Sequence, residues 1–273
     1  MHHRITESDS LYDHLESKST LDILSEINAE DQKVALAVEK IIPAITPLVD
    51  LLSKNFEAGG RLFYIGAGTS GRLGVLDASE IPPTYGMPHD RVIGLIAGGD
   101  SAIRKAVENA EDHSAQAWKD LEAYSINPLD VLVGIAASGT TPYVLGGLEA
   151  AKKAGITTAC VTNNPGSPIG SLVDFPIEVA VGPEYVTGST RMKSGTAQKL
   201  VLNMISTAYM IRVGRVKGNK MVHMQLSNDK LVQRGAAYIV EATGLSLQEA
   251  RALLNEYGSV HTAVNAFEKK SKS

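Results

Sequence analysis

The stretch between residues 61 and 78 constrains the fold of this chain more than any other. Residues 61–66 are a short apolar run typical of a buried strand, residues 66–71 are Gly-Ala-Gly-Thr-Ser-Gly, and residues 73–78 resemble the first turns of a helix. Such a turn suits a phosphate, because glycines let the backbone come close and the first N–H groups of a helix have no partner. The stretch therefore predicts an α/β fold with an anion site at this turn.

The pattern Gly66-x-Gly68-x-x-Gly71 has two other interpretations. A dinucleotide site requires an acidic residue about 20 positions later, at the end of the next strand. That region here is the break Ile-Pro-Pro-Thr-Tyr at 81–85, and the following strand candidate ends late, before Asp100. The dinucleotide interpretation is therefore disfavoured, and a purely structural turn stays open.

Strand and helix patterns alternate through the middle of the chain. Such alternation favours a parallel sheet with helices on both faces, and ligands then bind at the carboxyl ends of the strands. The predicted strands are 61–66, 91–97, 130–136, 156–162 and 176–181, and the helical stretches include 101–111, 114–124, 142–154 and 196–212.

The two ends of the chain are helical in pattern. Residues 1–15 are polar and expected to be loosely held. A cap at Ser19, a second cap at 28–31 and a periodic apolar pattern to Phe56 predict helices, with a bend at Pro43 and Pro47.

Toward the C-terminus, three capped helices are expected between 228 and 268, with caps at 227–230, Ser246 and Ser259. We expect an N-terminal helical arm (1–57), a sheet domain (58–220) and a small C-terminal helical bundle (221–273).

A second loop repeats the chemistry of the first. The strand at 130–136 leads into Ser138-Gly139-Thr140-Thr141 followed by Pro142, which suits the first turn of a helix. The hydroxyls of Ser70, Ser138 and Thr141 are candidate donors to a phosphate. No Walker lysine is present, so a compact phosphomonoester such as a sugar phosphate fits better than a nucleoside triphosphate. The alternative is that Ser138 and Thr141 only cap a helix.

Two acidic residues are candidates for acid–base chemistry. Glu80 lies just before Ile-Pro-Pro, and Glu111 lies in Glu-Asn-Ala-Glu-Asp at 108–112. Proton abstraction and donation on a sugar need two carboxyl groups with different surroundings. Both residues are equally compatible with a solvated surface, and spacing alone does not decide.

Composition limits the other classes of function. The net charge of −4 gives no basic footprint for nucleic acid, and no apolar run approaches the length of a membrane span. The N-terminus lacks the apolar core of a signal peptide, and the single cysteine, Cys160, suits a cytoplasmic protein. The scattered histidines show no metal-binding pattern, so no metal site is expected.

Residues 182–199 carry a specific signature, Gly-Pro-Glu-Tyr-Val-Thr-Gly-Ser-Thr-Arg-Met-Lys-Ser-Gly-Thr-Ala-Gln-Lys. This segment resembles one shared by the N-acetylmuramic acid 6-phosphate etherases and the glucokinase regulatory protein. Residues 66–72, 76–83 and 136–143 resemble the etherase segments in the same order. The resemblance extends from about 5 to 265, and the chain length is similar to that of the bacterial enzyme.

The resemblance implies a sugar isomerase (SIS) domain with a flavodoxin-like parallel sheet, acting as a homodimer without a cofactor. It implies a carbon–oxygen lyase of amino sugar catabolism that cleaves the lactyl ether of N-acetylmuramic acid 6-phosphate. Glu80 and Glu111 match the family's catalytic glutamates, Glu111 as the base at C2 and Glu80 as the acid toward lactate. The predicted substrate-binding residues are Thr69, Ser70, Ser138, Gly139, Thr140 and Thr141.

Two positions depart from the family pattern. Thr140 stands where a basic residue is frequent, and His223 stands where an acidic residue is frequent. Arg191 and Lys193 have two open interpretations, contact with the ligand or support of a loop and helix. A sugar-phosphate sensor and an aldose–ketose isomerase of the same domain class remain the alternative functions.

Overall fold

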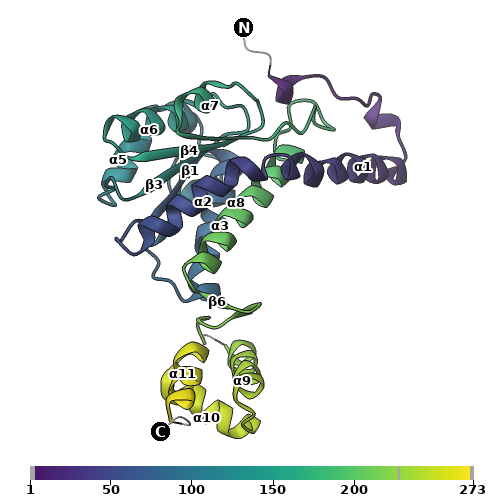
Figure 1. Cartoon of the computed structure of the whole chain (residues 1–273). Coiled ribbons are helices and arrows are strands. Elements are labelled where there is room, and N and C mark those ends of the chain that lie inside the picture. Colours follow the sequence, from purple (N-terminus) through teal and green to yellow (C-terminus); the bar gives the residue numbers. More distant parts are fainter. Residues whose placement is uncertain (1–3, 227, 271–273) are drawn as a thin grey trace. The chain divides into compact units, whose positions relative to one another are not determined.

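A computed structural model describes residues 4–226 and 228–270 of the chain. The chain forms two compact units (Figure 1). The first runs to Ala78 and resumes over Val92–Ser206, and the second comprises Ser79–Arg91 and continues from Thr207. The domain limits expected at 57/58 and 220/221 stay a prediction.

The first unit is built on a five-stranded parallel sheet in the order β2-β1-β3-β4-β5. This order confirms the predicted flavodoxin-like sheet, and its direction of winding reverses between β1 and β3. All five predicted strands are present, although β5 starts one residue before the expected 176–181 and ends earlier. The strands are β1 (Leu62–Gly66), β2 (Val92–Ile96), β3 (Val131–Ile135), β4 (Thr157–Thr162) and β5 (Phe175–Glu178).

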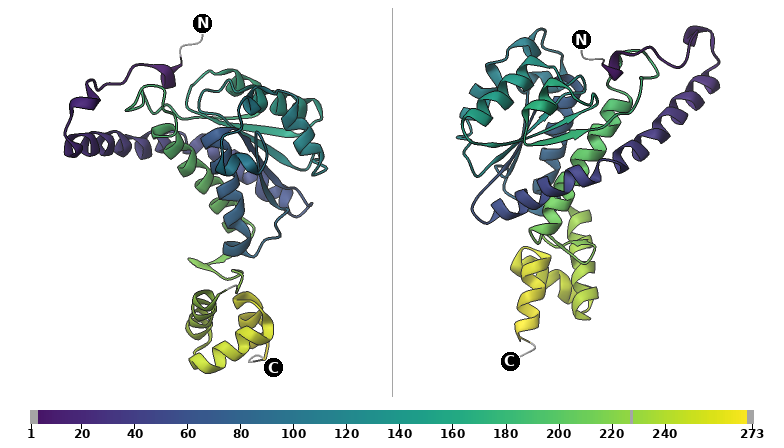
Figure 2. Two further views of the ribbon diagram at one scale, coloured as in Figure 1. Left: turned by 180° about the vertical axis from the view of Figure 1, so that it is seen from behind. Right: turned by 45° about the horizontal axis from the view of Figure 1, so that its top comes forward.

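Helices cover both faces of this sheet (Figures 1 and 2). On one face the strand side chains Phe63, Leu132 and Cys160 pack with Tyr143 and Leu148 into a core without solvent exposure. The helices that cover this face are α5 (Gln116–Glu122), α6 (Pro142–Lys153) and α7 (Pro168–Leu172). The other face is covered by α2 (Ile42–Phe56) and by the first-unit parts of α3 (Gly68–Tyr85) and α8 (Lys193–Arg212). The chain thus covers each face with elements distant in sequence.

The helix expected over 101–111 is wrong in its length. It ends as the short helix α4 (Ser101–Arg104), because Lys105 is extended with φ −131° and ψ 136°. A single 3₁₀ turn, η3 (Ala110–Asp112), follows later. It begins after Asn109, whose φ of +58° is left-handed and cannot continue a right-handed helix.

The N-terminal arm differs from its predicted form in two places. Helix α1 (Thr20–Glu39) passes through Asn28 without a second cap, and the chain breaks at 40–41 instead of bending at the prolines. Pro43 occupies the first turn of α2, where its missing N–H has no cost.

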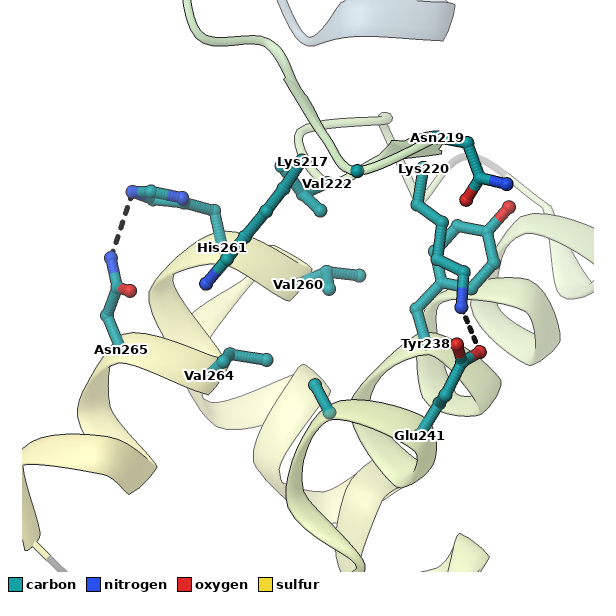
Figure 3. A pocket seen from close by; sticks show the side chains of 12 residues that line it. Lys217, Asn219, Lys220, Val222, Tyr238, Glu241, Val260, His261, Val264 and Asn265 are labelled. Carbon is teal, nitrogen blue, oxygen red and sulfur yellow. Dashed lines mark hydrogen bonds and ion pairs between the residues drawn. The ribbon is translucent and has the colours of Figure 1, made fainter.

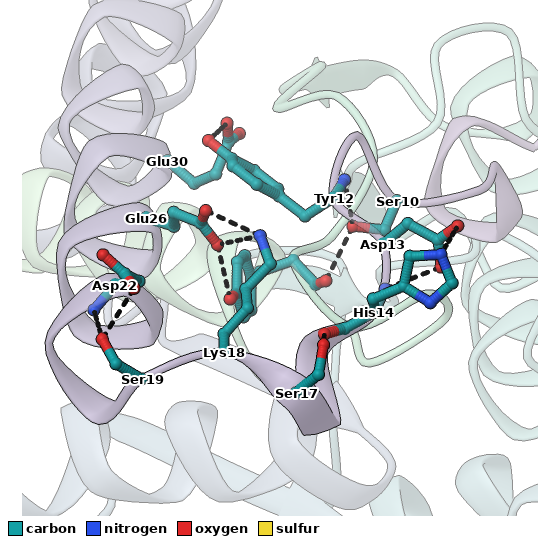
Figure 4. A network of polar contacts seen from close by, with 11 residues as sticks. Ser10, Tyr12, Asp13, His14, Ser17, Lys18, Ser19, Asp22, Glu26 and Glu30 are labelled. Atoms are coloured by element: carbon teal, nitrogen blue, oxygen red, sulfur yellow. Dashed lines mark hydrogen bonds and ion pairs between the residues drawn. The ribbon is translucent and has the colours of Figure 1, made fainter.

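Residues 4–19 form contacts with the rest of the first unit, contrary to the loose segment expected over 1–15, of which residues 1–3 lie outside the described residues. The two 3₁₀ turns η1 (Ile5–Glu7) and η2 (Leu15–Ser17) lie in this segment. Thr6 is fully buried and exchanges two hydrogen bonds with the Asn164 side chain, at 3.2 and 2.9 Å. Figure 4 shows Tyr12 directed at Glu30 and Lys18 directed at Glu26 of α1. The polar composition of this segment did not reveal that its side chains bind partners elsewhere in the chain.

The second unit contains a small antiparallel hairpin and the three predicted C-terminal helices. Ile239, Leu254 and Ala263 have no solvent exposure in its apolar core. Asn228 caps the first helix, while Ser227 lies outside the described residues. Ser246 and Ser259 cap the next two as expected. The elements are β6 (Val216–Lys217), β7 (Lys220–Met221), α9 (Asp229–Thr243), α10 (Leu247–Tyr257) and α11 (Val260–Lys270).

Among the described residues, no helix combines the length and apolar character that crossing a membrane requires.

Candidate active site

The first loop joins β1 to α3 at the carboxyl edge of the sheet. α3 begins at Gly68, so Thr69 and Ser70 lie in its first turn, where backbone N–H groups are available to an anion. Ser70 is buried, and its hydroxyl donates to Oε1 of Gln198 on α8 at 2.9 Å. The predicted strand, glycine turn and helix N-terminus are therefore present.

A cavity of about 210 Å³ opens beside the first loop. Ala67 and Gly68 line it from the loop, and Glu111 lines it from η3. Arg72 also lines it and donates to the carbonyl groups of Ala102 and Ile103 at 2.8 and 2.9 Å. Arg72 thereby anchors the end of α4 against α3. The structure brings Glu111 together with the first loop across more than 40 residues of sequence.

The second loop joins β3 to α6. The Ser138 hydroxyl oxygen accepts the N–H and the hydroxyl of Thr140, each at 3.2 Å, while Thr141 precedes α6 without a side-chain capping bond. Ser138 thus stabilises the turn, and Thr141 does not cap the helix through its hydroxyl. Gly139 has a φ of +69°, and a Cβ atom there would overlap Ser167. Only glycine fits this position.

The two loops flank the point where the strand order reverses. β1 and β3 are paired in parallel, with Gly66 opposite Ile135, so both loops leave the same edge of the sheet. A ligand crevice is expected at this position in an open α/β sheet. The second loop contributes none of the residues that line the cavity beside Glu111 within the described part of the chain.

Glu80 belongs to the second unit, on the exposed surface of α3. Glu111, also exposed, belongs to the first unit. A shared site of the two carboxyl groups stays a prediction, as does substrate contact by the six predicted binding residues.

The signature segment at 182–199 is held by buried charges. The Glu184 carboxylate accepts the backbone N–H groups of Lys193 and Ser194 at 2.8 and 2.9 Å and so satisfies the start of α8. The Lys193 ammonium pairs with Glu30 of α1 at 2.6 Å, and both side chains are at most 3% exposed. Lys193 therefore supports the loop and helix, whereas Arg191 is exposed.

Glu30 is the centre of this buried network. Burial alone would raise the pKa of Glu30, but hydrogen bonds from Lys193, Lys33 and Tyr12 lower that pKa to about 2. Sequence reasoning missed Glu30 and Glu184, because a glutamate that will be buried looks the same in a sequence as a solvated one. It also missed Gln198 and Asn163, which carry no pattern of their own.

His223 lies in the second unit, stacked on His261 with ring centres 4.5 Å apart. Burial, followed by the nearby His261 and Arg215, lowers the pKa of His223 to about 4. A separate cavity of about 270 Å³ lies between the hairpin, α9 and α11, and Figure 3 shows Lys217, Lys220 and His261 around it. None of the predicted site residues lines this cavity.

No group of three or more His, Cys, Asp or Glu side chains suited to a metal ion occurs within residues 4–226 and 228–270.

Comparison with known proteins identifies the domain type and the family. Residues 44–152 match the glucokinase regulatory protein N-terminal SIS domain, and residues 107–208 match the SIS domain. The chain is 60% identical over 264 residues to the N-acetylmuramic acid 6-phosphate etherase of Bacteroides fragilis, covering 97% of this chain and 94% of the relative. The chain belongs to the N-acetylmuramic acid 6-phosphate etherase family.

Other members of the family are similarly close. The etherase of Porphyromonas gingivalis is 59% identical over 270 residues, covering 99% of this chain and 98% of its own. That of Christiangramia forsetii is 61% identical over 261 residues, covering 96% and 95%. The match includes both loops and the signature segment, so the resemblance stated from the sequence is confirmed.

Solved structures support the fold. The phosphoheptose isomerase of Francisella tularensis aligns with a TM-score of 0.53 at 20% identity, covering 70% of this chain and 98% of its own. The phosphoheptose isomerase of Neisseria gonorrhoeae aligns with a TM-score of 0.54 at 19% identity and the same coverage. At these identities the comparison shows the architecture of the sheet alone.

Proposed function

We propose that this protein cleaves the D-lactyl ether of N-acetylmuramic acid 6-phosphate and releases N-acetylglucosamine 6-phosphate and D-lactate. The observation that carries the proposal is the cavity where Glu111 meets the first turn of α3. A carboxylate beside a phosphate-type loop can reach the carbons of a sugar whose phosphate the loop holds. The name of the related etherases supplies the substrate.

The phosphate is placed at the crevice between β1 and β3. In the proposal, N–H groups of the first turn of α3 bind it from one side, and Thr141 offers a hydroxyl that makes no helix-cap bond. Contacts with Thr69, Ser70, Ser138, Gly139 and Thr140 complete the proposed set. Several short hydrogen bonds from two loops would fix the phosphate and thereby the register of the sugar carbons.

The chemistry is an elimination followed by an addition. In the open sugar the C1 aldehyde acidifies the C2–H bond, and Glu111 removes that proton. The C3–oxygen bond then breaks, C2 and C3 form a double bond, and Glu80 protonates the departing lactate oxygen. Water adds at C3 of the unsaturated aldehyde, with Glu80 taking its proton and Glu111 returning one to C2. The protein is thus a carbon–oxygen lyase in the proposal.

A homodimer in the cytoplasm belongs to the same proposal. On α1, Leu21, Leu24 and Leu36 are 74%, 61% and 62% exposed, and exposed leucines on one helix favour contact with another protein surface. The proposed occupant is a second copy of this chain. Light scattering of the purified protein should give twice the mass of the chain, and a monomeric mass would contradict the dimer.

The deciding experiment follows D-lactate release in heavy-oxygen water. Purified protein is incubated with N-acetylmuramic acid 6-phosphate, and the masses of both products are measured by mass spectrometry. Heavy oxygen in N-acetylglucosamine 6-phosphate is expected, because water attacks C3. Heavy oxygen in lactate instead would mean attack at the lactyl carbon and would overturn the elimination scheme.

The same assay separates the alternative functions. Binding of the sugar phosphate without lactate release would favour a sensor. Interconversion of two hexose phosphates would favour an isomerase.

A further inference from the structure

Asp77 is a buried carboxyl group to which the proposed chemistry assigns no role. It lies on α3 and is 6% exposed. The Tyr64 hydroxyl of β1 donates to its Oδ2 at 3.1 Å, while Asn203 Nδ2 and the Ser206 hydroxyl of α8 donate to its Oδ1 at 3.1 and 3.0 Å. One side chain therefore ties α3 to both a central strand and a neighbouring helix.

The carboxyl group of Asp77 is not placed there for stability. Burial raises its pKa above the ordinary value, although the hydrogen bonds from Ser206, Tyr64 and Asn203 act in the opposite direction. A raised pKa means that the folded protein disfavours the ionised carboxyl group at this position. A role in fixing the direction of α3 accounts for the residue better than a role in stability.

The packing of α3 on the sheet makes this anchor decisive. A Cβ atom added at Gly74 would lie 3.0 Å from the Cβ atom of Tyr64, so the helix backbone runs close over β1 one turn before Asp77. A smooth glycine surface allows a helix to turn about its axis. The three hydrogen bonds of Asp77 remove that freedom, because any rotation would carry the carboxyl group away from its donors.

Glu80 follows Asp77 by three residues on the same helix, and residues at this spacing are neighbours on the helix surface. Pro82 and Pro83 come directly after it inside α3. Proline has no backbone N–H, so neither residue donates to the carbonyl group four positions earlier, at 78 and 79. The turn that carries Glu80 is thus weakly held from its C-terminal side and depends on the anchor that precedes it.

We propose that Asp77 is a positioning residue that sets the direction of the Glu80 carboxyl group for protonation of the departing lactate oxygen. The inference rests on the proposed function for the role of Glu80. Asp77 acts through α3, since its carboxyl oxygens are bonded to Tyr64, Asn203 and Ser206.

The variants Asp77→Ala and Asp77→Asn test this role as a pair. Asp77→Ala removes the anchor and should lower kcat for lactate release about 30-fold, with the affinity for N-acetylglucosamine 6-phosphate within about twofold of wild type. In Asp77→Asn the amide oxygen accepts from α8 and the NH₂ group donates to the Tyr64 oxygen, so kcat should stay within about threefold of wild type. Wild-type kcat in Asp77→Ala would overturn the inference.

A substrate analogue with chlorine at C3 in place of the lactyl ether separates positioning from general damage. Chloride leaves without a proton, so its elimination requires the base but not the acid. Asp77→Ala should therefore release chloride within about threefold of the wild-type rate while its lactate release is slow. Equal losses with both substrates would contradict an action through Glu80.

Asp130→Ala is the matched control. Asp130 is also fully buried, and its carboxylate accepts hydrogen bonds from Arg61 and from the backbone N–H of Asn127, but it directly precedes the opposite end of β3. This variant should lose stability in urea unfolding and keep wild-type kcat. A kcat loss equal to that of Asp77→Ala would show that any lost buried aspartate has the same effect, which overturns the inference.

The double variant Asn203→Ala/Ser206→Ala replaces Asp77→Ala if that protein does not fold. It leaves the carboxyl group in place and removes both donors on α8, so it should show the same contrast between slow lactate and near wild-type chloride release. Loss of both activities to the same degree would count against the inference.

Native-state hydrogen exchange tests the inference without any activity. If wild-type protein releases neither lactate nor chloride, the proposed function fails, and exchange alone decides. Asp77→Ala should speed exchange of the amides at 78–81 more than that of the amides at 69–72 at the start of α3. Unchanged exchange at 78–81 would mean that Asp77 does not hold this turn.

Discussion

The two loops at the crevice are alike in sequence and differ in how the protein uses them. Both follow a buried parallel strand, combine glycine with hydroxyl residues and begin a helix. In the first loop Ser70 is buried, and its hydroxyl donates a hydrogen bond to Gln198 on α8. In the second loop Ser138 is half-buried and bonds within its own turn, while Thr141 makes no capping bond.

The difference shows that a hydroxyl in a phosphate-type turn can also form hydrogen bonds within the protein. The first loop depends on a helix more than 120 residues away, through Gln198. The second is tied to the adjacent strand end, where Ala137 accepts from Asn163 and Asn164.

The largest expected effect on activity concerns Glu111, which lines a cavity together with the first loop but not with the second. Glu111→Gln should lower kcat for lactate release about 10³-fold, because general base catalysis is lost. Glu80→Gln should also lose turnover, with sugar-phosphate binding retained in both. Glu149→Gln, at an exposed position on the helix of the second loop, is the matched control. Full activity of Glu111→Gln would remove Glu111 from the role of base.

Lys193→Met should weaken the support of the first loop. The change removes one partner of buried Glu30 at the start of the helix that carries Gln198, at a cost of about 3 kcal/mol in unfolding free energy. Urea unfolding measures the loss. Native-state hydrogen exchange should rise more at 66–71 than at 137–141, and equal rises would show that the two loops share one support.

Acid titration gives a second measure of the same network. The pKa of Glu30 is lowered to about 2 from 4.5, so its ionised form stabilises the folded state above about pH 4.5. This stability is lost as the pH falls from 4.5 toward 2. Lys193→Met should show a shallower loss over that range than wild type, and an unchanged slope would contradict the assigned role of the pair.

Gly139→Ala and Gly68→Ala contrast the backbones of the loops. Both glycines have positive φ, +69° and +52°, but a Cβ atom at 139 overlaps Ser167 whereas one at 68 meets open space. We expect losses of about 2–3 kcal/mol at 139 and about 1 kcal/mol at 68. Chemical unfolding of both variants measures the difference. Equal losses would mean that strain alone, without crowding, sets the cost.

Thr141→Val should have the smallest effect on stability, within about 0.5 kcal/mol, because the hydroxyl caps no helix. Its affinity for N-acetylglucosamine 6-phosphate should fall about tenfold if the hydroxyl meets the phosphate. Ser138→Ala is the counterpart and should cost about 1 kcal/mol of stability through the lost bond to Thr140. Calorimetric binding and thermal unfolding together would separate ligand contact from turn support.

The sequence by itself determined the elements that depend on neighbouring residues. The strand at 62–66, its glycine turn and the helix beginning at Gly68 follow from apolar runs and backbone freedom within a few residues. The C-terminal helices followed from their caps in the same way. The helix expected over 101–111 was wrong in its length because Lys105 is extended and Asn109 is left-handed, which helical periodicity does not reveal.

Only the tertiary structure decided which polar side chains are buried as structural supports and which lie at the cavity. Glu30, Glu184 and Gln198 look like surface residues in a sequence, yet each is at most 2% exposed and hydrogen-bonded to a residue in another segment of the chain. Glu111 reaches the first loop because Arg72 and the turn at Asn109 place it there. The physical reason is that burial and hydrogen-bond direction depend on groups brought together by folding, whereas propensity and capping act within a single turn of chain.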